Sequence, residues 1–232
     1  MIPRSDSGRS PRVRSGFDGG LHSDLLFEGT GLVLTVDALI VLGALRAAGA
    51  GSEAWLHYLA NMGSPVGRAA SGVLLVSTLA FSLRWLLGSP VDRSAPSLAG
   101  APQGGRVPGL ERLEAALEWL FRIGGSVAAW ALPALMFALT LAAPLGWLSA
   151  AGSEGARGAA LRSWLESPAV QLVCAGVVSL TLWHAAHHLR LFMLDLGLSR
   201  IRTPVAYLLY GMALGGTALA SLQVLWTLAT GG

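Results

Sequence analysis

Five long apolar segments limit what this chain can fold into more than any other feature of its sequence. Each is about as long as the roughly 20 residues that a helix needs to cross the hydrocarbon layer of a membrane. A backbone in lipid must satisfy its own hydrogen bonds, so each segment is expected to be an α-helix. The chain is therefore predicted to be an all-α membrane protein whose five transmembrane helices cover approximately residues 29–48, 66–87, 123–150, 169–189 and 204–229.

The distribution of arginine predicts the direction of these helices. All 16 basic residues are arginine, and twelve of them lie in the N-terminal arm and in the loops that join the second span to the third and the fourth to the fifth. Because basic residues accumulate in cytoplasmic loops, the N-terminus is predicted to be cytoplasmic. This topology also explains the pI of about 9.7. No nucleic-acid partner is expected, and membrane lipid is the expected surrounding.

Composition divides the chain into four regions. Residues 1–23 are rich in Arg, Ser, Gly and Pro and are expected to form a disordered basic arm. A second stretch rich in Gly, Pro and Ser predicts a cytoplasmic linker at residues 91–109, between a two-helix half (24–90) and a three-helix half (110–232). Over residues 110–121, leucines recur at helical spacing opposite charged residues, which predicts a short interfacial helix that leads into the third span.

Little outside the spans could support chemistry. The outer loops, residues 49–65 and 151–167, look too short for a catalytic domain. The single cysteine, Cys174, lies in the fourth span, so neither an intrachain disulfide nor a cysteine metal cluster is expected. No cleavable leader is expected either, because the first apolar segment follows a long polar arm and lacks a clear cleavage site.

Two further features lie inside the spans. Asp37 is midway along the first span, where an unpaired charge is costly. Either a hydrogen bond to Ser77 or Thr78 of the second span or a role in a proton path would explain it. In the fifth span, a pattern of small residues predicts a close helix contact at Gly211, Gly215 and Gly216.

The end of the fourth span holds an unusual set of ionisable residues, within LWHAAHHLRLFMLDL at residues 182–196. At about 100° per residue, His184, His188 and Asp195 fall on one narrow stripe of the helix, with His187 about 60° to one side. Ionisable groups at membrane depth are costly, so this stripe is expected to face protein, ligand or water. In the predicted topology it lies just inside the cytoplasmic surface of the membrane.

These histidines give little support to a haem or a metal site. A bis-histidine haem needs axial ligands on facing helices, whereas His22 and His57 lie outside the spans and only the fourth span contains histidine. No haem held by this chain alone is expected. His184 and His188 have i, i+4 spacing but lack a third convergent ligand apart from the distant Asp195, so no metal site is predicted.

Two explanations of the histidine cluster remain. A lipophilic quinone needs an apolar slot, hydrogen-bond donors for its carbonyl oxygens and groups that exchange protons near neutral pH. Histidine suits the proton exchange, and the indole of Trp119 can donate one hydrogen bond. Alternatively, the histidines and Arg190 only reach toward lipid headgroups. Spacing alone does not choose between these explanations.

Several segments resemble a known family of membrane subunits. The three spans of the second half contain WLFRIGGSVAAWALP with LAAPLGWL, then LWHAAHHLRLFMLDLGL, then YLLYGMALGG. Over residues 111–228 these segments resemble the D subunit of quinol:fumarate reductase, one of its two membrane anchors. Residues 25–90 are similar to the C subunit through FEGTGLVL, SEAWLHYL, NMGSPV and RWLLGSP. The resemblance implies that the chain joins the two anchor subunits.

The resemblance also implies which residues meet the quinone. The expected quinone-binding residues are Glu28, Trp119, His184, His187 and His188. The expected proton carriers are Glu28, His187 and Asp195. His188 stands where the family commonly has arginine, while Phe27 and Phe81 stand where arginine and histidine can occur in the C subunit. These departures reduce the polar groups of the site, and His184 is expected to compensate for part of the loss.

The C-like half also lacks its third span. In the family that span ends outside the membrane while the D subunit begins inside, so a direct fusion of six spans would leave the linker on the wrong side. Dropping one helix keeps residues 91–109 cytoplasmic, which is also what the arginine distribution predicts.

The function implied is that of a membrane anchor in the bacterial inner membrane. The anchor would directly dock an iron–sulfur subunit, and a flavoprotein subunit through it, and would exchange electrons and protons with quinone or menaquinone. FAD and iron–sulfur clusters are expected only in those partners, where the dicarboxylate chemistry takes place. The alternatives are a dihaem cytochrome b-type anchor, which also commonly has five spans, and a non-redox scaffold or transporter.

Overall fold

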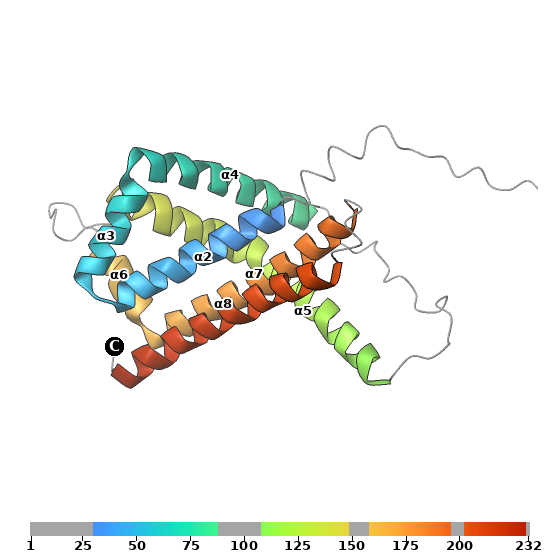
Figure 1. Cartoon of the computed structure of the whole chain (residues 1–232). Coiled ribbons are helices and arrows are strands. Elements are labelled where there is room, and N and C mark those ends of the chain that lie inside the picture. The colour runs from blue at the N-terminus through green and yellow to red at the C-terminus, as the bar shows by residue number, and fades with distance from the viewer. Residues whose placement is uncertain (1–29, 88–107, 149–157, 196–201, 231–232) are drawn as a thin grey trace, which may run out of the picture.

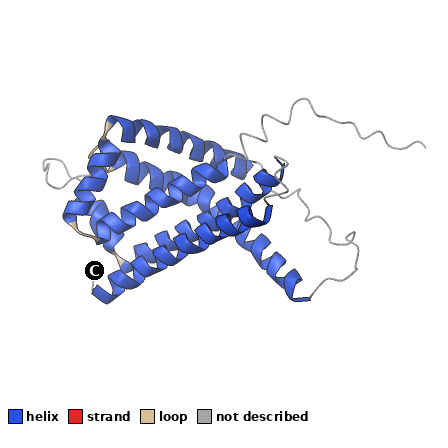
Figure 2. Cartoon of the chain, in the orientation of Figure 1, coloured by secondary structure: helices blue, strands red, loops and turns tan. Residues whose placement is uncertain are grey.

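The computed structural model describes residues 30–87, 108–148, 158–195 and 202–230. Over these residues the chain is helical and contains no strand (Figure 2). Five helices are long and apolar enough to cross a membrane, which confirms the predicted fold class. They are α2 (Thr30–Gly49), α4 (Pro65–Leu87), α5 (Pro108–Met136) with the π-helix η2 (Phe137–Ala142), α7 (Pro168–Asp195) and α8 (Arg202–Thr230).

The five spans run alternately up and down the bundle. α2 begins at the end of the bundle where α4 and α7 finish and where α8 starts, and the short helices lie at the opposite end (Figure 1). The side of the membrane on which each end lies stays a prediction. The basic arm at residues 1–23 and the linker at residues 91–109 lie outside the described residues.

α2 and α7 form the centre of the bundle, and α4 and α8 lie at its periphery. Of the residues in the apolar stretch that could cross the membrane, 56% are buried in α7 but only 17% in α8. α2 buries Leu34, Ala38, Val41 and Leu45, whose spacing places them on one helix face. The outward faces of α4 and α8 are largely apolar as well, as expected for helices that lie in lipid.

The third span ends earlier than its apolar sequence suggests. Pro133 lies inside α5 and cannot donate a backbone hydrogen bond, and a π-helix follows within one turn. The helix stops at Ala142 rather than near residue 150, because Pro144 again lacks a donor and Gly146 adopts a positive φ of 75°. The remaining apolar residues form turns.

The predicted interfacial helix at residues 110–121 is helical, but it is not a separate element. It forms the first turns of α5, which continues without a break into the third span. Figure 1 shows this part of α5 projecting beyond the ends of its neighbours. The side chains of residues 108–119 lie outside the part that the structure describes.

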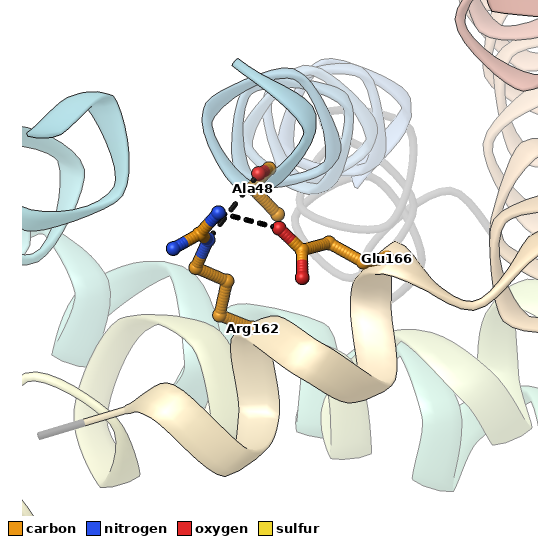
Figure 3. A network of polar contacts seen from close by, with 3 residues as sticks. All are labelled: Ala48, Arg162 and Glu166. Carbon is orange, nitrogen blue, oxygen red and sulfur yellow. Dashed lines mark hydrogen bonds and ion pairs between the residues drawn. The ribbon is translucent and has the colours of Figure 1, made fainter. Parts of the chain in front are cut away.

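Two short helices, α3 (Ser52–Gly63) and α6 (Ala159–Glu166), cover the opposite end of the bundle, where loops were expected. They bury Trp55, Leu59 and Leu165. Arg162 Nε donates to the carbonyl oxygen of Ala48 at 3.5 Å, and its Nη2 lies 2.6 Å from Glu166 (Figure 3). The carbonyl oxygen of Ala48 also accepts from the backbone N–H of Gly51 at 3.3 Å, and the guanidinium at this C-terminal end of α2 opposes the negative end of the helix dipole.

The predicted glycine contact of the fifth span is correct at one position and wrong at two. A Cβ on Gly216 would collide with Leu182 Cδ1 of α7, whereas Gly211 and Gly215 face open space. α8 therefore packs through the face that contains Gly216 together with Ala213, Ala220, Val224 and Thr227. The error arises because two faces of one helix carry small residues, and the sequence does not say which one meets a neighbour.

Asp37 is fully buried, and Thr78 donates its hydroxyl hydrogen to Asp37 Oδ2. Ser77, the alternative partner, bonds instead to the carbonyl oxygen of Val73 in its own helix. The structure thus confirms one of the two hydrogen bonds that the sequence suggested. It joins α2 to α4 at membrane depth, where the carboxyl group has no water to satisfy it.

Candidate functional site

The histidine cluster lies where all five spans approach one another at one end of the bundle. α7 carries His184, His187 and His188 in its final turns. The surrounding helices supply their neighbours, Trp85 from α4, Phe121 from α5 and Tyr210 from α8, while Gly31 of α2 packs against Ala185 and Leu189 of the same stretch of α7. The cluster therefore belongs to both halves of the chain.

His184 is a fully buried residue held in an aromatic enclosure. Its ring stacks on Phe121 with centroids 4.4 Å apart and planes 17° apart. Trp85 and Phe81 close two further sides, at 5.2 and 5.8 Å between ring centroids. Because Nδ1 lies 2.9 Å from the carbonyl oxygen of Phe121, it must carry a hydrogen and donate it.

The second ring nitrogen of His184 is available as an acceptor. In a neutral imidazole whose Nδ1 donates, Nε2 has a lone pair. His184 Nε2 is buried and finds no hydrogen-bond partner among the residues that the structure describes. A small donor that entered this enclosure would therefore find one fixed acceptor.

A pair of glycines makes room for His184. A Cβ on Gly124 would lie 2.5 Å from the carbonyl oxygen of Leu180, and one on Gly125 would lie 2.6 Å from both His184 Cε1 and the Trp85 ring. These distances are shorter than van der Waals contact, so α5 can approach α7 this closely only without side chains at both positions. This explains why the GG of WLFRIGGSV stands beside the histidine segment.

His187 points to a different neighbour. Its Nδ1 lies 2.9 Å from the Tyr210 hydroxyl of α8, and its half-buried ring is 4.7 Å from that of Phe121. Arg190 Nη1 also donates to the Tyr210 hydroxyl, at 3.4 Å, and its guanidinium carbon lies 6.0 Å from the centre of the tyrosine ring. His187 thus lies between α5 and α8.

The remaining predicted residues divide into those that the structure places and those that it does not. His188 is 7% exposed, and its ring centroid is 6.0 Å from that of His184. Trp119 and Asp195 lie in α5 and α7, but their side chains are outside the described part, as is the whole of Glu28. The roles of these three residues stay predictions.

Sequence reasoning missed the residue that organises the cluster. Phe121 contacts the rings of both His184 and His187, whereas a helical wheel compares only residues of α7 with one another. Tyr210 and Trp85 were missed for the same reason. All three lie within the motifs that carry the family resemblance, Phe121 in WLFRIGG, Tyr210 in YLLYGM and Trp85 in RWLLGSP.

Two further observations concern other kinds of site in the described part of the chain. Among residues 30–87, 108–148, 158–195 and 202–230, no group of three His, Cys, Asp or Glu side chains lies close enough to hold a metal ion. An open apolar surface lies along the first half of α4, at the end of that helix remote from Trp85, between Pro65 and Leu74. It lies far from the histidines.

Comparison with known proteins identifies the second half of the chain. The profile of the family described as the D subunit of fumarate reductase matches residues 111–225. The fumarate reductase D subunit of Mycobacterium bovis (strain BCG / Pasteur 1173P2) is 40% identical over 108 residues, which are 46% of this chain and 82% of the relative. The D subunits of Mycobacterium tuberculosis strains H37Rv and CDC 1551 match with the same identity and coverage.

No solved structure matches the chain significantly. The matched residues begin just before the third span and include α7 with its three histidines and most of α8, with Tyr210. Five apolar helices agree with a protein that spans the membrane several times. The chain therefore belongs to the family of fumarate reductase D subunits and is a multi-pass membrane anchor of a fumarate reductase complex.

Proposed function

We propose that this chain unites the C and D anchor subunits of a quinol:fumarate reductase in one polypeptide. It directly holds the iron–sulfur subunit, and the flavoprotein subunit through it, on the cytoplasmic face of the bacterial inner membrane. Electrons and protons are exchanged with an exchangeable quinone or menaquinone at the histidine cluster. FAD and the iron–sulfur clusters belong to the partner subunits, and this chain has no activity of its own.

The fusion is supported by the packing between the two halves. Gly31 of α2 lies against α7 so closely that a Cβ would be 2.9 Å from Leu189 Cγ and 3.2 Å from the carbonyl oxygen of Ala185. Trp85 of α4 reaches across to Ser126 of α5, with 3.4 Å between the indole nitrogen and the hydroxyl oxygen. The halves share one core, as two anchor subunits of one complex would.

The quinone site is supported above all by the position of His187. A half-buried imidazole at the end of the bundle, with Nδ1 beside the Tyr210 hydroxyl and its ring beside that of Phe121, can meet a ligand that enters from lipid. His184 and His188 lie deeper and contribute polarity beside the apolar wall formed by Phe121, Phe81 and Trp85. Lipid headgroups alone would not require a fully buried histidine.

Haem is not part of the proposal. His184, His187 and His188 all lie on α7, whereas a bis-histidine haem needs axial ligands on facing helices. Glu28, Trp119 and Asp195 complete the proposed quinone site and proton route. The first turns of α5, the N-terminal arm and the basic inner loops form the proposed docking surface.

Affinity purification from gently solubilised membranes tests the assembly. With the full chain as bait, we expect a flavoprotein and an iron–sulfur protein to co-purify, detected by flavin fluorescence and by the visible spectrum. A Soret band retained by the purified chain would instead favour a dihaem anchor. Recovery of the intact chain without flavin or iron–sulfur protein would favour a non-redox scaffold and reject the proposal.

The orientation has a separate test that exploits the single cysteine. In a Cys174→Ala background, Ser97→Cys and Ser153→Cys place one thiol in each predicted loop. In intact spheroplasts a membrane-impermeant maleimide is expected to label the cysteine at position 153, and the one at position 97 only after permeabilisation. The reverse pattern would place the docking surface outside the cell and contradict the proposed orientation.

A further inference from the structure

Asp37 is hydrogen-bonded on only one of its two carboxyl oxygens. Thr78 donates to Oδ2, whereas Oδ1 is buried and finds no partner among the residues that the structure describes. No charged side chain of these residues bonds to either oxygen. A carboxylate at membrane depth without a cation is costly, so the neutral acid with its hydrogen on Oδ1 is the favoured form. Because Thr78 donates to the other oxygen, the link between α2 and α4 does not depend on that hydrogen.

Thr181 of α7 also has a polar atom without a partner. Thr35, Thr140 and Thr217 each donate to the carbonyl oxygen of the residue four positions earlier, as threonines in helices commonly do. Thr181 is fully buried like Asp37, but its hydroxyl group bonds to nothing in the described part of the chain. It is therefore available to a group from outside its own helix.

The packing of α2 against α7 brings Asp37 and Thr181 to the same depth in the bundle. The two helices run in opposite directions (Figure 1), and Gly31 of α2 lies beside Ala185 and Leu189 of α7. Asp37 lies about 9 Å further along α2 than Gly31, at a rise of about 1.5 Å per residue. On α7, Thr181 lies about 6 Å from Ala185 and about 12 Å from Leu189 in the same direction.

His184 lies about one turn nearer the end of the bundle. It is about 4.5 Å beyond Thr181 along α7, and its ring contacts that of Phe81, which stands one turn beyond Thr78 on α4. Its Nε2 is the buried acceptor described above. Three buried polar atoms without described partners thus come from α2 and α7 at neighbouring depths. Ordered water, which typically makes about three hydrogen bonds, normally satisfies such atoms.

We propose that Asp37, Thr181 and His184 surround one internal water molecule and form a proton-holding site. Asp37 is the acid of this site, and His184 Nε2 is its base. The water accepts from Asp37 Oδ1–H and from the Thr181 hydroxyl, and donates to His184 Nε2. Asp37 touches no substrate and acts only through His184.

The proton transfer in this site is balanced without an outside reactant. The O–H bond of Asp37 breaks, its hydrogen joins the water, and another hydrogen of that water forms an N–H bond at His184 Nε2. A carboxylate and an imidazolium result, and no electron moves. Thr78 still donates to the carboxylate, and the Nδ1–H of His184 still donates to the carbonyl oxygen of Phe121. The net charge of the site is unchanged, but a positive charge moves to the histidine cluster.

This shift of charge has a use that rests on the proposed quinone site. A quinol becomes an anion when its first proton leaves, before both electrons have passed to the iron–sulfur subunit. An imidazolium at His184, beside His187, would stabilise that anion without taking a charge from solvent. When the anion is gone, the proton returns to Asp37 and the neutral pair is restored.

Infrared spectroscopy of the assembled complex tests the site without using quinone. The spectrum of the original complex minus that of Asp37→Asn should contain the carbonyl stretching band of a protonated carboxylic acid. The band should shift after equilibration in D2O, because the hydrogen exchanges. Asparagine is similar in size and can still accept from Thr78, so the variant is expected to assemble. A carboxylate band in place of the acid band, or an acid band that D2O does not shift, would overturn the proposal.

Thr181→Val tests the bridging water. Valine has the shape of threonine but cannot bond the water, so the acid band of Asp37 should move in frequency. Thr35→Val is the matched control, because the hydroxyl group of Thr35 bonds to its own helix, and it should leave the band in place. An unchanged band in Thr181→Val would show that Asp37 and Thr181 share no ligand and would also overturn the proposal.

Kinetics test the use of the site. In Asp37→Asn, kcat/KM for a soluble naphthoquinol should fall by about tenfold or more, because one interaction that stabilises the developing charge is lost. Fumarate reduction by a reduced viologen should continue, since it bypasses the membrane site. Glu53→Gln, on exposed α3, should change neither rate.

Two failures can be told apart. Should Asp37→Asn keep its quinol kinetics while His187→Ala loses quinol oxidation, the link between the proton-holding site and the quinone is wrong and the quinone site stands. Should neither substitution affect quinol oxidation in a complex that retains its viologen activity, the proposed quinone site is wrong. The infrared bands then still decide whether Asp37 holds an exchangeable proton.

Discussion

Replacement of His187 by alanine is expected to reduce quinol-linked fumarate reduction by a factor of about 100 or more, while reduction by an artificial soluble donor continues. A positioned acid or base typically contributes about 10²–10⁴-fold to a rate. The soluble donor delivers electrons to the partner subunits without using the membrane site, so its rate reports only assembly and dicarboxylate chemistry. The ratio of the two rates, measured on purified complex, isolates the contribution of the imidazole.

His57→Ala is the appropriate comparison, because His57 is exposed on α3 at the opposite end of the bundle. It should change neither rate. Glu28→Gln is expected to resemble His187→Ala, with Glu53→Gln, on exposed α3, as its own control. Equal loss of both activities in His187→Ala would show that the residue supports assembly rather than quinol chemistry, and would reject the assigned role.

The second large effect is expected on stability, from Gly125→Ala. The new Cβ would lie 2.6 Å from His184 Cε1 and from the Trp85 ring, and His184 is fully buried with the half-buried Trp85 ring against it. Overpacking of this kind typically costs about 1–3 kcal/mol. We expect a lower midpoint of thermal unfolding in detergent and a loss of quinol-linked activity, because His184 and Phe121 must shift.

Gly176→Ala separates this steric effect from the general effect of removing a helical glycine. Gly176 is exposed on α7 with no atom near its Cβ position. Alanine is a better helix former than glycine by up to about 1 kcal/mol, so Gly176→Ala should be neutral or stabilising. Gly125→Ala is therefore expected to lower the midpoint of thermal unfolding, whereas Gly176→Ala is expected to leave it unchanged or raise it. A Gly125→Ala protein as stable as the original would contradict the close contact between α5 and α7.

The spans were predictable because their apolar length is a property of the sequence alone. The two short helices α3 and α6 were not, since they owe their stability to a few residues, among them Trp55 and Leu165, that pack on the ends of longer helices. The end of the third span was misplaced for a related reason. Its composition stays apolar to Trp147, but Pro144 and Gly146 stop the helix.

The candidate site was only half predictable. The helical period correctly brings His184 and His188 to neighbouring positions on α7, with ring centroids 6.0 Å apart. It cannot say that Phe121 lies against two of the histidines, nor that Tyr210 meets His187. These contacts depend on how far each helix is shifted along its axis relative to its neighbours. That shift is set by the packing of Gly31, Gly124 and Gly125.

The uninterrupted course of α5 has a mechanical consequence. Residues 108–119 extend about 18 Å, at 1.5 Å per residue, beyond the point where the same helix enters the membrane. An α-helix is stiff over this length, so a protein bound to the protruding segment could tilt the whole helix, including Phe121. Such a tilt would displace the Phe121 ring, which packs against two imidazoles. In the proposed assembly, binding of the soluble subunits to this segment would therefore be coupled, through one continuous helix, to the position of the ring beside the histidines.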